Sequence, residues 1–275
     1  MIHHLGRYEI IGELGKGAMG LVYKAHDPII DRILAIKTIS LSLAMDEREE
    51  YEARFYQEAK AAGRLNHPNI ITVYDVGKSD NVAYIVLEYL EGRELNEILN
   101  DGKHLPIFQI LDIVKQVAQG LTYAHEHGVV HRDIKPSNIM VTNNSQVKIT
   151  DFGIARMTSS AVQTQTGTVL GTPKYMSPEQ VLGKPLDQRS DIFSLGVMLY
   201  EMLTETAPFV GDTLHEIMSQ TININPPAPS AINNQLPAGL DFIVAKALEK
   251  EPNNRYQSAR EFASDLSDAA ILCII

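Results

Sequence analysis

The sequence contains one cysteine, Cys273, among 275 residues. A single cysteine cannot form an internal disulfide, which is typical of proteins in a reducing compartment. The chain also lacks any run approaching about 20 apolar residues, so no segment is expected to span a bilayer. Basic residues are outnumbered, 24 against 34 acidic ones, and the formal charge is −10. DNA would on average be repelled, and we see no local basic patch, so nucleic-acid binding is not expected.

The start, MIHHLGRYEI, lacks the apolar run of a signal peptide. The end, residues 269–275, is a seven-residue apolar tail. We interpret the tail as the last turn of a helix packed on the core, and the alternative is a boundary just before a membrane segment. We therefore expect a cytoplasmic protein, or the cytoplasmic domain of a longer membrane protein, with no membrane contact from this chain itself.

Length and composition predict an ordinary globular protein. At about 100–200 residues per domain, the chain forms one large domain or two lobes. With 44% hydrophobic and 21% charged residues, disorder, collagen-like repeats and coiled coils are excluded.

The first ninety residues are strand-rich. Short β-branched segments bounded by Gly, Asp or Pro predict five strands, at 8–14, 21–26, 33–39, 70–76 and 82–90. A charged helix is predicted from Glu47 to Leu65.

From residue 94 the pattern becomes helical. A helix should begin at Pro106 and end at Gly128. Further helices are predicted at 190–204, 213–221, 238–249 and 258–270. Residues 157–171 have no apolar period and predict a long loop, of the kind that is often functional. A small β-rich lobe joined to a larger helical lobe suggests a cleft between them.

Glycines occupy the first, third and sixth positions of Gly15-Lys16-Gly17-Ala18-Met19-Gly20-Leu21-Val22. Glycine lets the backbone approach phosphate oxygens closely. Three glycines so placed should arise by chance in about one chain in ten of this length, so the spacing alone is weak. A dinucleotide-binding fold requires a helix directly afterwards, whereas here a strand follows. The context favours a glycine-rich hairpin over a nucleotide.

Lys37 ends the third predicted strand. It is either a solvated strand-end lysine or a cation near phosphates, and a buried lysine needs a carboxylate partner to remain charged. Glu58, on the following helix, is the candidate partner, although Glu49, Glu50 and Glu52 lie nearby.

Two later segments decide the interpretation. They are His131-Arg132-Asp133-Ile134-Lys135-Pro136-Ser137-Asn138 and Asp151-Phe152-Gly153. Chance agreement at five such positions, at about 5% each, is about one in a million or rarer per window. Over residues 8–266 the chain resembles the eukaryotic-type protein kinases. Residues 171–180 and 190–196 resemble the bacterial serine/threonine kinases most.

The resemblance implies an α+β, two-lobed protein-kinase fold. Its parts would be a small lobe at 8–87, with a five-stranded antiparallel sheet and one helix, a hinge at 88–93, a mainly helical lobe at 94–266 and a tail at 267–275. It implies a transferase that moves the γ-phosphoryl group of ATP to protein Ser/Thr hydroxyls, with Mg²⁺ or, as a substitute, Mn²⁺. A bacterial signalling role is implied with it.

Catalytic roles follow from the same resemblance. Asp133 would accept the substrate hydroxyl's proton and Lys135 would reach the γ-phosphate. Asn138 and Asp151 would hold the metal, while Lys37, paired with Glu58, would grip the α- and β-phosphates. The alternative for Asp133 and Asp151 is two solvated loop aspartates.

The resemblance also implies an ATP pocket. Its glycine-rich part would be Gly15, Lys16, Gly17, Ala18, Met19, Gly20 and Leu21, and its adenine part Leu14, Val22, Ala35 and Met140. Leu87 would lie at the back, Glu88, Tyr89 and Leu90 would offer backbone hydrogen bonds, and Glu94 would touch the ribose. Each apolar residue of this set could equally be plain core.

Regulation and specificity are further expectations. Arg132 would pair with a phosphate on the loop after Asp151, and Thr164 and Thr166 are the candidate autophosphorylation sites. The alternative is that this loop is merely polar. A homodimer through the small lobe is a hypothesis carried from bacterial relatives. Lys135 and Thr172 indicate Ser/Thr rather than Tyr specificity.

Three expectations concern the large lobe. Glu179 and Arg255 should form a buried ion pair, as in the family. Ser177 stands where Ala is more usual, away from phosphate and metal. The cluster of His125, His127 and His131 lacks a nearby cysteine, so we expect His125 and His127 to decorate a helix C-terminus and His131 to be packed, without zinc.

Two other functions compete with an active kinase. A catalytically silent scaffold would bind partners through the same fold, but Lys37, Asp133 and Asp151 are all present. A small-molecule phosphotransferase is disfavoured because residues 172–179 resemble a docking platform for polypeptides.

Overall fold

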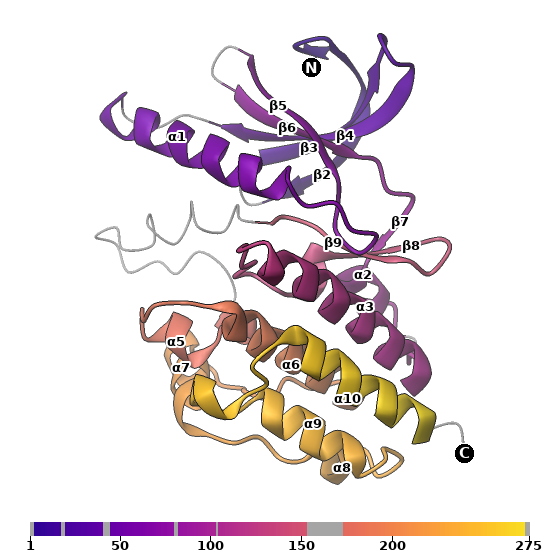
Figure 1. Ribbon diagram of the computed structural model, residues 1–275, viewed down its shortest axis with the longest axis vertical. Coiled ribbons are helices and arrows are strands. Elements are labelled where there is room, and N and C mark those ends of the chain that lie inside the picture. The colour runs from indigo at the N-terminus through magenta and orange to yellow at the C-terminus, as the bar shows by residue number, and fades with distance from the viewer. Residues whose placement is uncertain are drawn as a thin grey trace.

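The computed structural model describes residues 3–17, 20–40, 45–79, 82–102, 104–152 and 173–272. Figure 1 shows two parts, a sheet with one long helix above a larger bundle of helices. This two-lobed α+β arrangement is the one expected from the sequence. Several residues named above lie outside the described ranges, namely Ala18, Met19, Gly153, Thr164, Thr166, Gly171, Thr172 and Cys273.

The small lobe contains an antiparallel sheet in the order β1-β2-β3-β4-β6-β5. The strands are β1 (His4–Leu5), β2 (Tyr8–Gly17), β3 (Gly20–Asp27), β4 (Arg32–Ser40), β5 (Val73–Ser79) and β6 (Val82–Glu88). The prediction of five strands missed β1, which pairs with β2 after a turn at Gly6, where φ is 57°. A two-residue strand is too short to show an alternating pattern, so the sequence gives no signal for it.

The strand predicted at 70–76 begins three residues later than expected. Residues 70 and 71 pair instead with the large lobe, since Ile70 bridges to Ile149 and the Ile71 amide donates to the Ile149 carbonyl at 2.9 Å. The apolar run is therefore divided between two partners. Its first part connects the lobes and only its second part joins the sheet.

Helix α1 (Met45–Ala62) packs across the small-lobe sheet (Figure 1). Phe55 and Ala59 are buried with Ile39 and Ile85 in one apolar cluster, which explains the i, i+4 spacing on this helix. Ala62, one turn later, belongs to the main core of the large lobe. The end of α1 is thus shared by both lobes.

A second sheet lies between the lobes, in the order β7-β8-β9. Its strands are β7 (Gly92–Glu94), β8 (Ile139–Thr142) and β9 (Val147–Ile149). β7 overlaps the last two residues of the predicted hinge, and β9 ends two residues before Asp151. This sheet carries Glu94 and Met140 of the predicted ATP pocket.

The large lobe is built around α3 (Ile107–Glu126) and α6 (Gln188–Thr204). Nearly all of α6 is buried, so it forms the centre of the core. The remaining elements are α2 (Leu95–Asn100), η1 (Pro136–Asn138), η2 (Pro173–Tyr175), α5 (Pro178–Val181), α7 (Leu214–Asn223), α8 (Pro229–Ile232), α9 (Gly239–Ala247), η3 (Pro252–Asn254) and α10 (Ala259–Leu272). Of these, α7, α9 and α10 were predicted to within three residues at either end.

The predicted pair of Glu179 and Arg255 is confirmed. Two guanidinium nitrogens of Arg255 donate to the two carboxylate oxygens of Glu179, each at 2.7 Å, and the Arg255 side chain is 0% exposed. Ser190 donates to the same carboxylate. Burial alone would raise the pKa of Glu179, but the hydrogen bonds from Arg255 and Ser190 lower it below its ordinary value.

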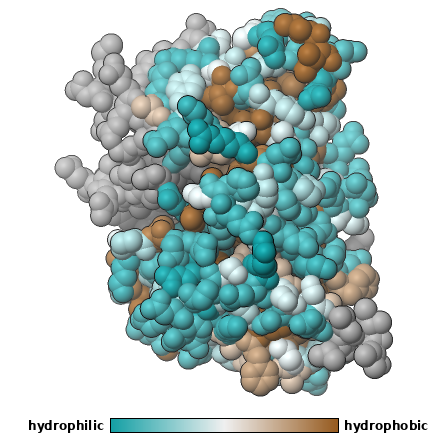
Figure 2. Space-filling model, viewed as in Figure 1, coloured by the Kyte–Doolittle hydropathy of each residue, from teal (hydrophilic) through white to brown (hydrophobic). Residues whose placement is uncertain are grey.

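Within the described residues, no helix combines the length and apolar content needed to cross a membrane. The face seen in Figure 2 is mostly hydrophilic, with a hydrophobic group at the top of the small lobe. Ile29 and Ile30, in the turn between β3 and β4, are 72% and 54% exposed.

Candidate active site

Lys37 and Asp151 meet between the lobes. The Lys37 Nζ atom lies 2.7 Å from Asp151 Oδ2, although 114 residues separate them in the sequence. β4 positions Lys37 and the end of β9 positions Asp151. The Lys37 side chain is largely buried, at 11% exposure, so the solvated strand-end alternative is excluded.

Sequence reasoning paired Lys37 with Glu58, and that pairing stays a prediction. The ion pair that the structure shows for Lys37 is with Asp151, and it follows from the position of β9. Residues 70 and 71 hold Ile149 against the base of the small lobe, so Asp151 comes within reach of the β4 lysine.

Asp133 is oriented by two donors. Lys135 Nζ lies 2.7 Å and Asn138 Nδ2 lies 3.0 Å from Asp133 Oδ2. The Asp133 side chain is 39% exposed, so its carboxylate can be reached from solvent. The structure therefore brings Asp133, Lys135 and Asn138 together, as the spacing of the motif predicts.

Two residues of this site have a strained backbone. Arg132, directly before Asp133, has φ 70°, and Asp151 has φ 61°. Residues other than glycine reach this left-handed region only at a cost in free energy, and such strain is often found at functional sites. Contacts with neighbouring elements must compensate for it.

His131 is one such contact and is fully buried, as predicted. Its Nε2 atom lies 2.8 Å from the Thr150 carbonyl, and its Nδ1 atom accepts from the Asp133 amide at 3.2 Å. These bonds are consistent with a neutral ring protonated at Nε2. His131 thereby links the loop of Asp133 to the segment of Asp151.

Asp191 on α6 is the second contact. Its carboxylate accepts from the amides of His131 and Arg132, at 2.8 and 2.7 Å, and lies 2.8 Å from His125 Nε2. Burial would raise the pKa of Asp191, but the hydrogen bond from His125 and the nearby backbone amides lower it. His125 lies in the last turn of α3, as expected. Its side chain is nevertheless only 4% exposed, because it faces this buried carboxylate.

Asn138 and Asp151 fit the role of metal ligands. The Asn138 carbonyl accepts from the amide of Thr150, at 2.9 Å, so the two candidate ligands lie on neighbouring segments. The Asn138 Nδ2 atom also donates to the Asp133 carbonyl, at 2.7 Å, which leaves the amide oxygen as the atom that can bind a cation. Carboxylate and amide oxygens suit Mg²⁺.

The predicted adenine pocket is partly assembled. Ala35 and Leu87 are cross-strand neighbours in β4 and β6, and Val22 and Leu90 pack against the same cluster. Met140 pairs with Glu94 across β8 and β7. The structure thus gathers these residues from both lobes around the hinge.

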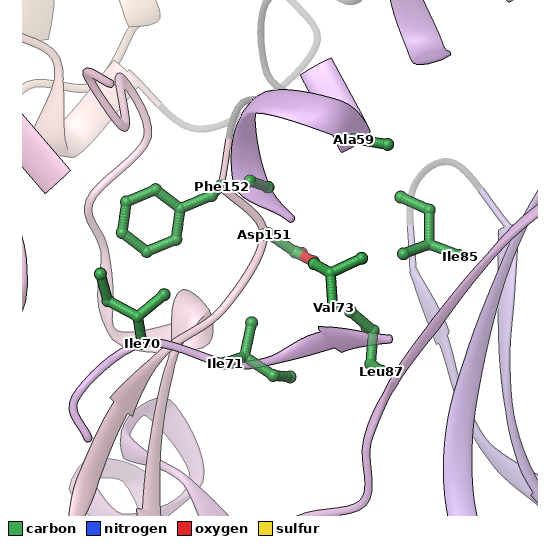
Figure 3. A pocket seen from close by; sticks show the side chains of 9 residues that line it. Ala59, Ile70, Ile71, Val73, Ile85, Leu87, Asp151 and Phe152 are labelled. Atoms are coloured by element: carbon green, nitrogen blue, oxygen red, sulfur yellow. The ribbon is translucent and has the colours of Figure 1, made fainter. Parts of the chain in front are cut away.

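Leu87 also lines an apolar pocket next to Asp151 and Phe152 (Figure 3). In Figure 3 the carboxylate of Asp151 and the ring of Phe152 point to opposite sides of the chain. The ring of Phe152 packs edge-on against His131, with centroids 4.7 Å apart. Leu87 therefore lines the same pocket as Asp151, and its place at the back of the ATP site stays a prediction.

Burial and the neighbouring carboxylates of Glu97 and Asp151 raise the pKa of Glu94, while Lys37 opposes the change. Glu94 lies opposite Met140 across β7 and β8, beside the other residues of the predicted pocket. Glu88 is held in a different way, since its Oε1 atom accepts from Lys148 Nζ at 2.6 Å and from the Thr72 amide at 2.7 Å.

The glycine-rich segment forms the hairpin of β2 and β3, as expected, with Gly15 opposite Val22 and Lys16 opposite Leu21. A Cβ atom at Gly20 would lie 1.8 Å from the Thr38 carbonyl oxygen, so packing inside the protein already requires glycine there. At Gly15 a Cβ would meet nothing within 4 Å. Leu14, on the same hairpin, is 46% exposed.

Three residues of the site were missed by the sequence reasoning. Asp191 lies in a helix whose residues are nearly all buried, so periodicity does not single it out. Lys148 lies in a strand too short to reveal which residues are buried. Gln180 had a signal, because Ser177 and Gln180 have the spacing of a helix capping box.

Comparison with known proteins agrees with this geometry. The protein kinase domain family model matches residues 8–265. A probable serine/threonine-protein kinase of Streptomyces coelicolor is 46% identical over 95% of this chain, and the serine/threonine-protein kinase PrkC of Bacillus subtilis is 39% identical over 96%. This chain covers 39% and 40% of those proteins, about two fifths of their length.

A solved structure of a kinase domain is similar to this chain over nearly its whole length. The crystal structure of the PknI kinase domain of Mycobacterium tuberculosis superimposes with a TM-score of 0.79 at 31% identity. The match covers 98% of this chain and 99% of that one.

Proposed function

Because this chain belongs to the protein kinase family and is similar to its bacterial serine/threonine members, we propose that it transfers the γ-phosphoryl group of Mg-ATP to Ser and Thr hydroxyls of proteins. The observation that carries the proposal is the meeting of Lys37 and Asp151 beside the loop of Asp133. Phosphoryl transfer needs positioning and charge neutralisation more than covalent chemistry, and these groups supply both.

Asp133 is the proton acceptor in this proposal. Its carboxylate is exposed enough to receive a substrate hydroxyl, and Lys135 and Asn138 hold it in one orientation. The ammonium group of Lys135, next to that carboxylate, is suitably placed to bind the γ-phosphate. Together they align the hydroxyl with the phosphorus atom it attacks.

Lys37, Asn138 and Asp151 bind the nucleotide and its metal. Mg²⁺ held by Asn138 and Asp151 would neutralise charge that develops on the phosphate oxygens. The positive charge of Lys37 would pair with phosphate oxygens of ATP, and the negative charge of Asp151 would pair with Mg²⁺. The adenine would lie among Val22, Ala35 and Leu87, with Leu14 and Met140 at its faces.

A transfer assay separates this function from its alternatives. The protein is incubated with γ-labelled ATP, Mg²⁺ and a generic basic protein, and the labelled amino acids are identified after hydrolysis. We expect phosphoserine and phosphothreonine, and loss of the label when EDTA removes the metal. A silent scaffold would transfer no label, a small-molecule phosphotransferase would leave the protein unlabelled, and phosphotyrosine alone would contradict the specificity argued from Lys135 and Thr172.

Autophosphorylation at Thr164 and Thr166 is part of the same proposal. Both residues lie outside the described ranges, but Arg132 supports the idea, because its Nε atom is buried and has no hydrogen-bond partner among the described residues. A phosphate on the loop would satisfy this guanidinium group. Mass spectrometry after incubation with Mg-ATP should find phosphate on Thr164 and Thr166, and an active enzyme unmodified at both would refute the assignment.

The length of the relatives suggests where the proposed kinase acts. Relatives of this type are longer than this chain, so the proposed kinase would act as one part of a bacterial signalling protein in the cytoplasm or at its membrane. Self-association through the small lobe would allow one copy to phosphorylate another.

A further inference from the structure

Gln180, on α5, uses both ends of its side-chain amide. The Oε1 atom accepts from the Ser177 amide at 2.9 Å, which closes the capping box that begins α5. The Nε2 atom points to another element and donates to the Arg132 carbonyl at 2.8 Å. Capping therefore accounts for only half of the contacts of this side chain.

The bond to Arg132 falls on the peptide unit that joins Arg132 to Asp133. The oxygen of that unit accepts from Gln180, and its N–H group, which belongs to Asp133, donates to His131 Nδ1 at 3.2 Å. The Arg132 amide, one peptide earlier, donates to Asp191 at 2.7 Å. The backbone leading into Asp133 is thus held from three directions.

This backbone needs such support because Arg132 has φ 70°. Without the Gln180 bond, the peptide could rotate towards an unstrained conformation, and its oxygen would lack its present donor. Rotation of this peptide would move the Asp133 side chain, which starts at the next Cα atom. Lys135 and Asn138 orient the carboxylate itself but do not hold that peptide.

We propose that Gln180 is a positioning residue for phosphoryl transfer, which fixes the Arg132–Asp133 peptide so that the Asp133 carboxylate points at the substrate hydroxyl. This inference rests on the proposed kinase function. It also connects the chemistry to α5, the first α-helix after residues 153–172, where the candidate phosphorylation sites lie in the sequence.

Three variants separate positioning from capping. Gln180→Glu keeps an oxygen for the Ser177 amide, since Glu is as good as Gln in a capping box, but it cannot donate to Arg132 when ionised. Ser177→Ala removes the other half of the capping box and keeps the Gln180 amide. Gln180→Met removes both contacts at nearly constant volume.

The readouts are kcat and the KM for ATP in the transfer assay, with the melting temperature of each variant. For Gln180→Glu we expect kcat to fall by about tenfold or more, on the scale of one lost hydrogen bond, with KM for ATP and melting temperature near wild type. Ser177→Ala should lower the melting temperature and leave kcat near wild type. Gln180→Met should lower both.

The positioning role is overturned if Gln180→Glu keeps the wild-type kcat, or if its kcat falls only together with its melting temperature, as a purely structural contact would require. It is also overturned if Ser177→Ala reduces kcat as much as Gln180→Glu does. Wild-type protein that transfers no phosphate would overturn the proposed function and this role with it, whereas active wild type with an unaffected Gln180→Glu variant overturns the role alone.

Discussion

Replacing Asp133 with Asn is expected to lower phosphoryl transfer by at least about a hundredfold, the scale of a lost general base. The substitution keeps the size of the side chain and its neighbours Lys135 and Asn138. However, a neutral amide cannot accept the hydroxyl proton, and it no longer attracts the Lys135 ammonium. The loss should appear in kcat, measured with Mg-ATP and a protein substrate, while the KM for ATP changes little.

The matched control is Asp268→Asn, the same chemical change at an exposed position on α10. We expect wild-type kinetics for this variant and an unchanged melting temperature for both. If Asp133→Asn retained more than about a tenth of the wild-type kcat with its fold intact, Asp133 would not be the proton acceptor.

Arg255→Met should destabilise the large lobe by about 3–5 kcal/mol, because it leaves the Glu179 carboxylate buried without its bidentate partner. For a chain of this size the melting temperature would fall by roughly 6–20 °C. The double variant Glu179→Leu with Arg255→Met should recover much of this loss, since it removes both charges together. Thermal unfolding of the three proteins tests this, and an Arg255→Met variant as stable as wild type would contradict it.

The same pair predicts a pH dependence. The pKa of Glu179 is lowered in the folded protein, so ionised Glu179 contributes stability above the ordinary glutamate value of 4.5 and loses it as the pH falls towards the lower folded value. The advantage of wild type over the double variant should therefore shrink below pH 4.5. Melting temperatures measured between neutral pH and the acid limit of folding check this, and a difference that grows on acidification would be inconsistent with it.

The sequence predicts elements well where one local pattern determines them. The hairpins of the small lobe and the long helix α3 follow from apolar spacing and from their bounding Gly and Pro residues. The strand at 70–76 was misplaced because an apolar run does not show which partner it joins, and Ile70 joins β9 while Val73 joins β6. α5 was missed because four residues give no period, although its capping box was visible.

In the candidate site, too, the sequence predicts what a local motif determines and misses contacts between distant segments. The spacing of a short motif identified Asp133, Lys135 and Asn138, and the structure gathers them. Contacts between distant segments have no local signal. Lys37 meets Asp151 across 114 residues, and His125 meets Asp191 across 66. Periodicity cannot predict such pairs, because it reports which side of an element is buried and not what lies opposite.

The sharing of the end of α1 between the lobes sets the geometry of any motion of that helix. Ala62 and Leu65 belong to the large-lobe core, and Ile71 is bonded to β9, whereas Phe55 rests on the small-lobe sheet. Because residues of both lobes hold its C-terminal end, any swing of α1 would pivot near Ala62. Its first turns would then move furthest, and Glu58, one turn before Ala62, would move only a short way.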